Sequence, residues 1–212
     1  MHHELYSTSF ARDRMIGQQI RPSDVHDDRI LSELATLSRE QFVQARLRRL
    51  AYAETNIPLL HGHSMMTPRV EGELLQALNL TNQDDVLEIG TGSGYVTACL
   101  ARLGNQVTSI ELHADQLELA RQSLARTGLR NIETRCEDAF AYTDERQYDA
   151  IAVTGSLPLY DDRFEHHLRP GGRLFVIVGQ GPAMEARLSR LGIRAGPGYP
   201  TVDIRQPGHG FG

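Results

Sequence analysis

Three glycines, each separated by one residue, form the segment of this sequence whose spacing points most directly to chemistry. Residues 86–95 read VLEIGTGSGY, an apolar run followed by glycines and then by a segment with helical periodicity. Glycine permits a tight turn and lets a ligand lie against bare backbone, and the N-terminus of the following helix offers free N–H groups. The cofactor contacts expected in this turn are Gly90, Thr91, Gly92, Ser93 and Gly94.

Acidic residues beside this turn indicate which cofactor it binds. Glu111 ends the next apolar run, 111 − 90 = 21 positions after the first glycine, where a carboxylate can accept both hydroxyls of a ribose. The third glycine comes one residue earlier than in the dinucleotide fingerprint, which favours S-adenosylmethionine (SAM). Because SAM has no pyrophosphate, Glu88 can lie beside its cationic sulfonium and amine. The alternative is a structural turn that binds nothing.

A third acidic position follows the third apolar run. Asp138 and Ala139 come directly after residues 132–136, at the sheet edge where open α/β folds bind their ligands. We expect Asp138 to accept a hydrogen bond from the adenine amino group and Ala139 to lie in the same site. The alternative for Asp138 is an exposed acidic residue in a turn.

These residues need a parallel sheet to position them, and the pattern of the chain predicts one. Five apolar runs alternate with helical segments, at residues 86–89, 107–110, 132–136, 148–154 and 174–178. This alternation is typical of a Rossmann-like α/β sheet flanked by helices. We therefore predict an α/β fold for residues 81–180.

The two ends of the chain differ from this core. Residues 1–80 read as helices and loops, including a helix that Thr67 caps and Pro68 opens. Residues 181–212 are predicted to be a helix followed by a loop-like tail, because residues 192–212 hold six glycines and three prolines. Only residues 201–204 could form a short strand there. We predict one domain, residues 1–212, with an atypical C-terminus.

The amino-acid composition of the chain limits the kinds of partner that it is expected to bind. The chain has 212 residues and a net charge of −5, which does not suit a protein that binds the phosphate backbone of nucleic acids. Two cysteines are too few for a disulfide framework, and no Cys/His spacing predicts a metal site. No apolar run is long enough to span a membrane or resembles a signal peptide. We expect a cytoplasmic protein, of open oligomeric state, with no metal, nucleic acid or membrane partner.

Several segments together resemble the protein-L-isoaspartate O-methyltransferases. They are LEIGTGSGY at 87–95, YDAIAVT at 148–154, PGGRL at 170–174, REQFV at 39–43, AYAE at 51–54 and GHSMMTP at 62–68. The resemblance covers residues 15–179 and implies that SAM donates a methyl group to the α-carboxylate of isoaspartyl residues in damaged proteins or peptides. S-adenosylhomocysteine is the other product. A carboxylate is already ionised at neutral pH, so no strong base is expected.

The sequence departs from this family in two places. In the family's GQTISQP element, Met66 stands at the active-site serine, and a thioether cannot donate a hydrogen bond to a carboxylate. Ser64 or Thr67 are the substitute hydroxyls that we consider, although Thr67 also suits a helix cap. The family's sheet continues with two further strands, but the segment after Gly179 offers no convincing pair of apolar runs. Either the fifth strand is left as an exposed edge, or the tail is a shortened or altered form of the family's ending. Two alternatives therefore stay open: a SAM-dependent methyltransferase for another carboxylate or small molecule, and a SAM-binding homologue without catalysis.

Overall fold

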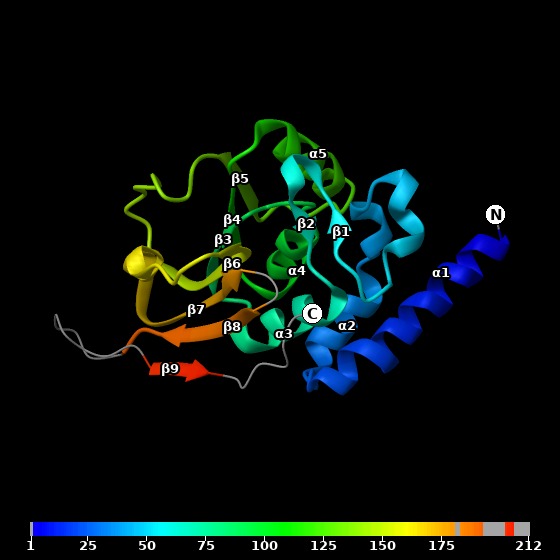
Figure 1. Cartoon of the computed structure of the whole chain (residues 1–212), viewed down its shortest axis with the longest axis horizontal. Coiled ribbons are helices and arrows are strands. Elements are labelled where there is room, and N and C mark those ends of the chain that lie inside the picture. The colour runs from blue at the N-terminus through cyan, green and yellow to red at the C-terminus, as the bar shows by residue number, and fades with distance from the viewer. Residues whose placement is uncertain (1, 181–182, 193–201, 206–212) are drawn as a thin grey trace.

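The computed structural model describes residues 2–180, 183–192 and 202–205, which include a mixed seven-stranded sheet (Figure 1). The strand order is β5-β4-β3-β6-β7-β8-β9. The bounds are β3 Asp85–Ile89, β4 Gln106–Glu111, β5 Ile132–Cys136, β6 Tyr148–Leu157, β7 Leu168–Gln180, β8 Ala183–Arg190 and β9 Val202–Arg205. Strands β3 to β7 pair in parallel. The predicted Rossmann-like α/β class is confirmed, with its five parallel strands in the expected places.

The register of the central strands fixes where a site can form. Strands of a parallel sheet are buried on both faces, and in β3 the adjacent Val86 and Leu87 are fully buried in two different clusters. Ile89 pairs with Ile110 of β4 and with Val153 of β6. The carboxyl ends of three strands therefore lie side by side, and the glycine-rich turn follows the middle one.

Helices α4 (Tyr95–Leu103) and α5 (Ala114–Ala125) confirm the two helices predicted inside the core. Every residue of α4 except Arg102 is buried, because the helix lies between the sheet and the N-terminal segment. Leu100 of α4 and Leu124 of α5 belong to the same apolar cluster as Val86. One face of the sheet is thus covered by helices.

The opposite face differs from the predicted alternation. Residues 137–147, between β5 and β6, contain no helix, and the connection from β6 to β7 holds only the 3-10 helix η6 (Asp162–His167). Aromatic residues fill this face instead: Tyr142, Tyr148 and Phe164 are buried against Leu87 and Ile151. Large rings from short connections cover the apolar surface that helices were expected to cover.

The N-terminal segment contains short helices and one small sheet. Its elements are α1 His2–Met15, η1 Ile16–Ile20, η2 Arg21–Ser23, α2 Asp28–Thr36, η3 Arg39–Phe42, η4 Ala45–Leu50, β1 Ile57–Pro58, η5 Leu60–Gly62, β2 Ser64–Met65 and α3 Pro68–Leu78. Helix α3 begins at Pro68, as predicted, and buries Val70, Leu74, Leu75 and Leu78. Thr67 occupies the cap position, but its hydroxyl makes no capping hydrogen bond, so that detail of the prediction is wrong.

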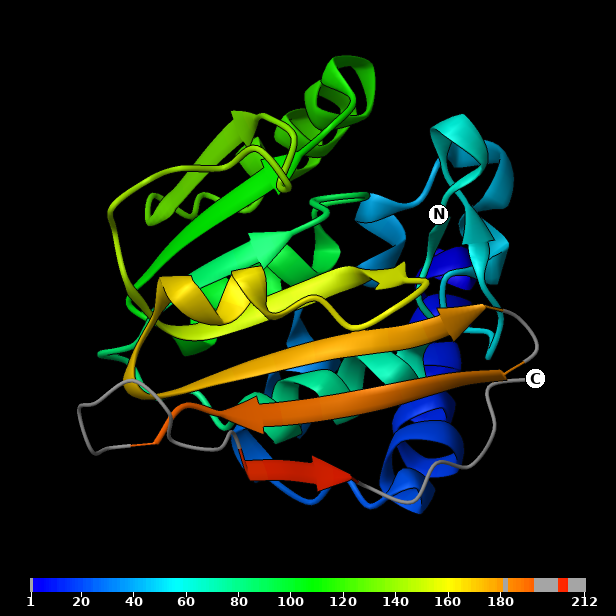
Figure 2. The same ribbon diagram turned by 60° about the vertical axis from the view of Figure 1, so that its left-hand side comes forward.

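Two predictions for the C-terminal part are also wrong. Residues 183–190 form β8 rather than a helix, and with β9 they continue the sheet beyond β7 (Figure 2). The composition of β8 favours a helix, but Met184, Ala186 and Leu188 alternate along it and pack against the main apolar cluster. Pairing with β8 also covers the edge of β7. Tertiary contacts therefore override local propensity.

The short strand expected near residue 201 appears as β9, displaced by one residue from the prediction. Residues 193–201 and 206–212 lie outside the described residues, so the loop prediction for the glycine- and proline-rich tail stays a prediction. Among the described helices, none has the length and apolar character that crossing a membrane requires. Within the same part of the chain, no three side chains of the metal-binding types converge on one point.

Candidate active site

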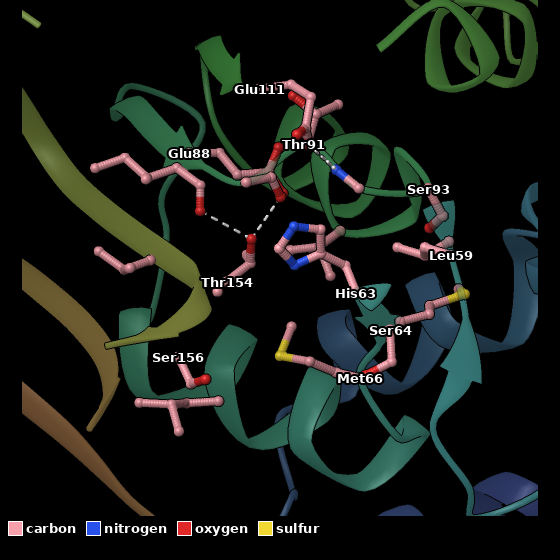
Figure 3. Close-up of a pocket in the computed structure, with 18 of the residues that line it drawn as sticks. Leu59, His63, Ser64, Met66, Glu88, Thr91, Ser93, Glu111, Thr154 and Ser156 are labelled. Atoms are coloured by element: carbon pink, nitrogen blue, oxygen red, sulfur yellow. Dashed lines mark hydrogen bonds between the residues drawn. The ribbon is translucent and has the colours of Figure 1, made fainter. Parts of the chain in front are cut away.

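A cavity of about 630 Å³ opens where the carboxyl ends of β3, β4, β5 and β6 meet (Figure 3). One wall carries the glycine-rich turn and the residues that follow these strands. Residues 54–71 of the N-terminal segment form the opposite wall. The structure therefore brings the predicted cofactor residues and the predicted substrate-side residues to one site.

The backbone of the glycine-rich turn needs glycine for two reasons. Gly90 and Gly92 have φ values of +99° and +53°, in the region that side chains disfavour. A Cβ on Gly90 would lie 2.8 Å from Oγ1 of Thr154, and one on Gly92 would lie 3.3 Å from Cδ1 of Leu59. The turn is therefore packed on both sides, and its exposed backbone forms part of the cavity wall.

The other residues of the turn mostly make hydrogen bonds and packing contacts within the protein. Thr91 shares a hydrogen bond with Ser109 at 2.6 Å, and Ser93 accepts one from the Tyr95 amide at 3.2 Å, at the start of α4. Gly94 does not line the cavity, because it faces α5, where a Cβ would lie 3.1 Å from Leu124. The structure gives Gly94 a packing role, and its contact with the cofactor stays a prediction.

Glu88 is a completely buried carboxylate that lines the cavity. Its Oε2 accepts hydrogen bonds from Thr97 at 2.5 Å and from Ser109 at 2.6 Å, whereas its buried Oε1 has no partner among the described residues. Burial raises the pKa of Glu88 to about 8, and the two hydroxyls only partly oppose that rise. A carboxylate with one oxygen left without a donor suits a cationic ligand.

Glu111 ends β4, as predicted, and faces the glycine-rich turn. Its Oε2 accepts a hydrogen bond from the amide of Gly92 at 2.9 Å, and its Oε1 accepts one from the amide of His113 at 3.2 Å. The side chain lines the cavity but is only 7% exposed. These two amides hold the carboxylate at the point where the ribose of SAM was expected.

Asp138 and Ala139 follow β5 and line the same cavity. One oxygen of Asp138 accepts the amide of Phe140 at 2.9 Å, so the residue does form the turn that the alternative interpretation described. Beside it, the exposed apolar side chains of Leu112 and Phe140 also line the cavity. A cavity wall that carries an acidic residue and two apolar side chains is compatible with a flat base that has an amino group.

A short loop from the N-terminal segment covers the glycine-rich turn. Leu59 packs over Gly92, and the amide of Leu60 donates to Oε1 of Gln116 at 3.1 Å. The amide nitrogen of that same Gln116 side chain donates to the carbonyl of Gly92 at 2.5 Å. Gln116 of α5 therefore connects the covering loop to the cofactor turn.

A buried ion pair anchors this covering wall. Arg39 and Glu71 are 0% and 1% exposed and form two hydrogen bonds of 2.9 Å each. Arg39 also donates to the carbonyls of Ala51 at 2.5 Å and Met66 at 2.7 Å. One guanidinium group thus ties three separate segments together, and it does so through the backbone at Met66.

Comparisons with known proteins agree with this geometry. The family model described as protein-L-isoaspartate(D-aspartate) O-methyltransferase matches residues 11–196. The chain is 37% identical over 182 residues to the protein-L-isoaspartate O-methyltransferase of Koribacter versatilis (strain Ellin345), covering 84% of this chain and 82% of that protein. The chain belongs to this family. A second relative, from Rhodopseudomonas palustris (strain HaA2), is 36% identical over 188 residues, covering 87% of this chain and 76% of that protein.

A solved structure extends the likeness to the fold. The putative isoaspartyl methyltransferase of Plasmodium falciparum, in complex with S-adenosyl-L-homocysteine, matches with a TM-score of 0.77 and 15% identity over 94% of each chain. At this identity the comparison concerns the fold alone. It supports the isoaspartyl methyltransferase fold over nearly the whole chain, beyond the residues in which the sequence resemblance was found.

The structure also places the residues at which the chain departs from the isoaspartyl methyltransferase pattern. The thioether of Met66 points into the cavity, toward the wall that carries Ser156 (Figure 3). Ser64 lies in β2 with an exposed side chain, and Thr67 lines the cavity, although its Oγ1 is buried and has no partner among the described residues. A catalytic role for either hydroxyl stays a prediction.

Sequence reasoning missed several residues of the cavity. Thr154 donates to the carbonyl of Ile89 at 3.0 Å or of Gly90 at 2.5 Å, and Ser156 follows it on the same wall. His63 projects into the centre of the cavity from the opposite wall (Figure 3). The signal for Thr154 and Ser156 was their place just after the fourth apolar run, because every strand of the parallel core ends at this edge.

Proposed function

We propose that this chain transfers a methyl group from S-adenosylmethionine to the carboxylate of isoaspartyl residues in damaged proteins and peptides, which begins their repair. The match to the isoaspartyl methyltransferase family over residues 11–196 carries this proposal. The relatives from Koribacter versatilis and Rhodopseudomonas palustris bear the name of this activity, and the solved relative from Plasmodium falciparum is in complex with the demethylated cofactor.

The residues of the cavity fit this cofactor. Bound SAM supplies a methyl group on a positively charged sulfur. The free Oε1 of Glu88 offers a negative charge to the cationic part of the ligand, and Glu111 lies where ribose hydroxyls can donate to a carboxylate. Leu112 and Phe140 offer apolar contact to the adenine, with Asp138 beside them. Gly90 and Gly92 leave the backbone open to the ligand.

The acceptor carboxylate must be aligned with the methyl group, and it does not need a base to activate it. A carboxylate with an ordinary pKa of about 4 is ionised at neutral pH, so its oxygen attacks the methyl group without transferring a proton. The task of the protein is to hold this oxygen in line with the methyl group and to exclude water. The loop with Leu59 and the side chain of Met66 supply apolar cover on the substrate side.

A paired assay tests the proposal. Two peptides that differ only in having an L-isoaspartyl or a normal aspartyl residue are incubated with the protein and methyl-labelled SAM. We expect label in the isoaspartyl peptide and none in its twin. Equal labelling of both, or none in either while calorimetry detects SAM binding, would reject the repair activity.

Met66 favours one second candidate, a SAM-dependent methyltransferase for a different carboxylate or a small molecule. A thioether on the substrate wall suits an apolar acceptor better than a charged one. The Met66→Ser variant separates the two functions in the paired assay. Isoaspartyl labelling that appears only in this variant would identify the native chain as diverted from repair, and a cofactor-binding protein without catalysis would label no acceptor.

We further propose a cytoplasmic location and a single domain without a nucleic-acid partner. Both cysteines, buried Cys99 and exposed Cys136, are free thiols, which suits a reducing compartment. The net charge of −5 opposes binding to a phosphate backbone. One apolar cluster includes residues of α2, α3, α4 and the sheet, which supports a single folding unit.

A further inference from the structure

The substrate wall lacks the hydroxyl that the family resemblance places at position 66. Arg39 fixes the backbone of Met66, so the thioether occupies this point of the cavity and offers no donor. When the acceptor carboxylate enters the cavity, it loses its hydrogen bonds to water. Donors on the protein must replace them, because an unpaired charge is costly in a partly apolar site. Another donor on the cavity wall is therefore required.

Strand β6 contains an irregularity that changes which side chains reach the cavity. Val153 pairs with Val176 of β7, but the next paired residues are Ser156 and Ile177. Thr154 and Gly155 are therefore extra residues on the β6 side. Bulges are uncommon in parallel pairs and often lie next to active sites, where they redirect a side chain.

A hydrogen bond and close packing hold this bulge against the glycine-rich turn. The hydroxyl of Thr154 donates to the backbone carbonyl of Ile89 or Gly90, and a Cβ on Gly90 would lie 3.4 Å from the amide nitrogen of Gly155. Among the described residues, no atom lies within 4 Å of a Cβ built on Gly155 itself, so the bulge leaves open space beside the turn. Ser156 follows directly, at a position fixed relative to the cofactor site.

The hydroxyl of Ser156 is available to a ligand. It is exposed, lines the cavity and makes no hydrogen bond to any described residue. In Figure 3, Ser156 lies across the cavity from Met66. The other hydroxyls on this wall already make hydrogen bonds. Thr91 bonds to Ser109, Thr154 donates to the turn, and Ser93 accepts from the first amide of α4.

The two hydroxyls of the opposite wall are less well placed. Thr67 lines the cavity, but its Oγ1 is buried at the start of α3 and is less accessible to a substrate oxygen than the exposed hydroxyl of Ser156. Ser64 belongs to β2, a strand of two residues that pairs, within the described part of the chain, with β1 alone. A group that must orient a reacting atom works best on a rigid element, and Ser156 meets this condition whereas Ser64 does not.

We propose that Ser156 donates the hydrogen bond that orients the acceptor carboxylate, in place of the hydroxyl that Met66 does not supply. This inference rests on the proposed function. The role is to bind and position the substrate, and no proton is transferred.

The test measures methylation of the isoaspartyl peptide by four variants: Ser156→Ala, Ser156→Thr, Ser64→Ala and the double variant Met66→Ser with Ser156→Ala. Ser32→Ala, an exposed serine of α2 far from the cavity in the fold, is the matched control. We expect Ser156→Ala to lower kcat/KM by about tenfold, mainly through a higher KM, because a hydrogen bond to a charged group is lost. Calorimetry should give an unchanged SAM affinity.

Recovery of activity in two variants distinguishes a positioning role of Ser156 from a purely structural one. Ser156→Thr keeps the hydroxyl and should retain most activity, and the double variant should regain it by restoring a hydroxyl on the opposite wall. A Ser156→Ala enzyme with wild-type KM, or a loss of activity in Ser64→Ala instead, would overturn the inference and leave the repair function intact. A wild-type protein that binds SAM but does not label the isoaspartyl peptide would overturn the proposed function itself.

Discussion

On the cofactor wall of the cavity, hydroxyl and amide groups donate hydrogen bonds to buried carboxylates. On the substrate wall the backbone is held, whereas the side chains of His63, Ser64 and Met66 make no hydrogen bond to a described residue. Glu88 and Glu111 accept four hydrogen bonds between them, from β4, α4, the turn and the residue that precedes α5. Across the cavity, His63 and Ser64 are exposed and reach the site from a loop and a two-residue strand.

This difference shows how a family can keep its cofactor and change its substrate contacts. The geometry of the cofactor wall follows from the register of the sheet, so a substitution there disturbs several elements together. The substrate wall depends on the bond from Arg39 to the carbonyl of Met66, which any side chain at that position leaves in place. A methionine can therefore replace a serine without loss of the fold.

The largest expected effect comes from removing the anchor of the substrate wall. Arg39→Met leaves the buried Glu71 without its partner, which typically costs about 3 to 5 kcal/mol of stability. The free energy of unfolding, measured by denaturant titration, should fall by about this amount. Arg163→Met is the matched control, because its ion pair with Asp161 is largely exposed and should contribute less than about 1 kcal/mol. Similar losses in the two variants would contradict the anchoring role.

Substitution in the cofactor turn should reduce SAM binding by a smaller energy. Gly90→Val places a side chain at a φ of +99° and a Cβ 2.8 Å from Thr154, so the turn must move away from β6. We expect the SAM affinity measured by calorimetry to fall by about a hundredfold. The circular dichroism spectrum should remain that of a folded protein. Gly17→Ala is the control, because no atom of a described residue lies within 4 Å of a Cβ built there. Equal SAM affinity in Gly90→Val would show that the ligand does not use this turn.

The cofactor wall was also the part that the sequence predicted best. A strand, three glycines, a helix and Glu111 lie close together along the chain, and parallel pairing brings their ends to one edge. At Gly94 the pattern predicts a cofactor contact and does not reveal the contact with Leu124 of α5, because that contact depends on helix packing.

The rest of the site depends on contacts between distant segments. Arg39 and Glu71 are 32 positions apart, and neither residue alone indicates a buried pair. Strand β8 has a helical composition and becomes a strand only because β7 offers an open edge. Ser156 reaches the cavity through a bulge, which is defined by pairing with β7. Such features follow from tertiary structure, where propensity and periodicity carry little information.

A more modest loss is expected at the ribose position. Glu111→Ala removes the carboxylate that faces the turn and should weaken SAM binding by about 1 to 3 kcal/mol, the usual contribution of hydrogen bonds to a charged group. Glu111→Gln keeps an acceptor for the amide of Gly92 and should lose less. Calorimetry of both variants measures the difference. Wild-type affinity in Glu111→Ala would place the ribose elsewhere and remove Glu111 from the cofactor wall.

The smallest expected effect is a dependence of SAM affinity on pH through Glu88. With a pKa of about 8, the buried carboxyl is mostly protonated at neutral pH in the free protein. A cationic ligand beside its free Oε1 favours the ionised form and lowers this pKa, so binding releases a proton below pH 8. Affinity should therefore rise with pH, by at most about tenfold per pH unit, and level off above pH 8.

Calorimetry in buffers of different ionisation enthalpy counts the protons released on binding at pH 7. Glu88→Gln is the matched variant, because it keeps acceptors for Thr97 and Ser109 but cannot ionise. In this variant both the proton release and the pH slope of affinity should disappear. If they persist, the linkage does not arise from Glu88, and the buried carboxylate does not sense the charge of the cofactor. The proton count therefore decides whether this carboxylate of the cofactor wall responds to the ligand.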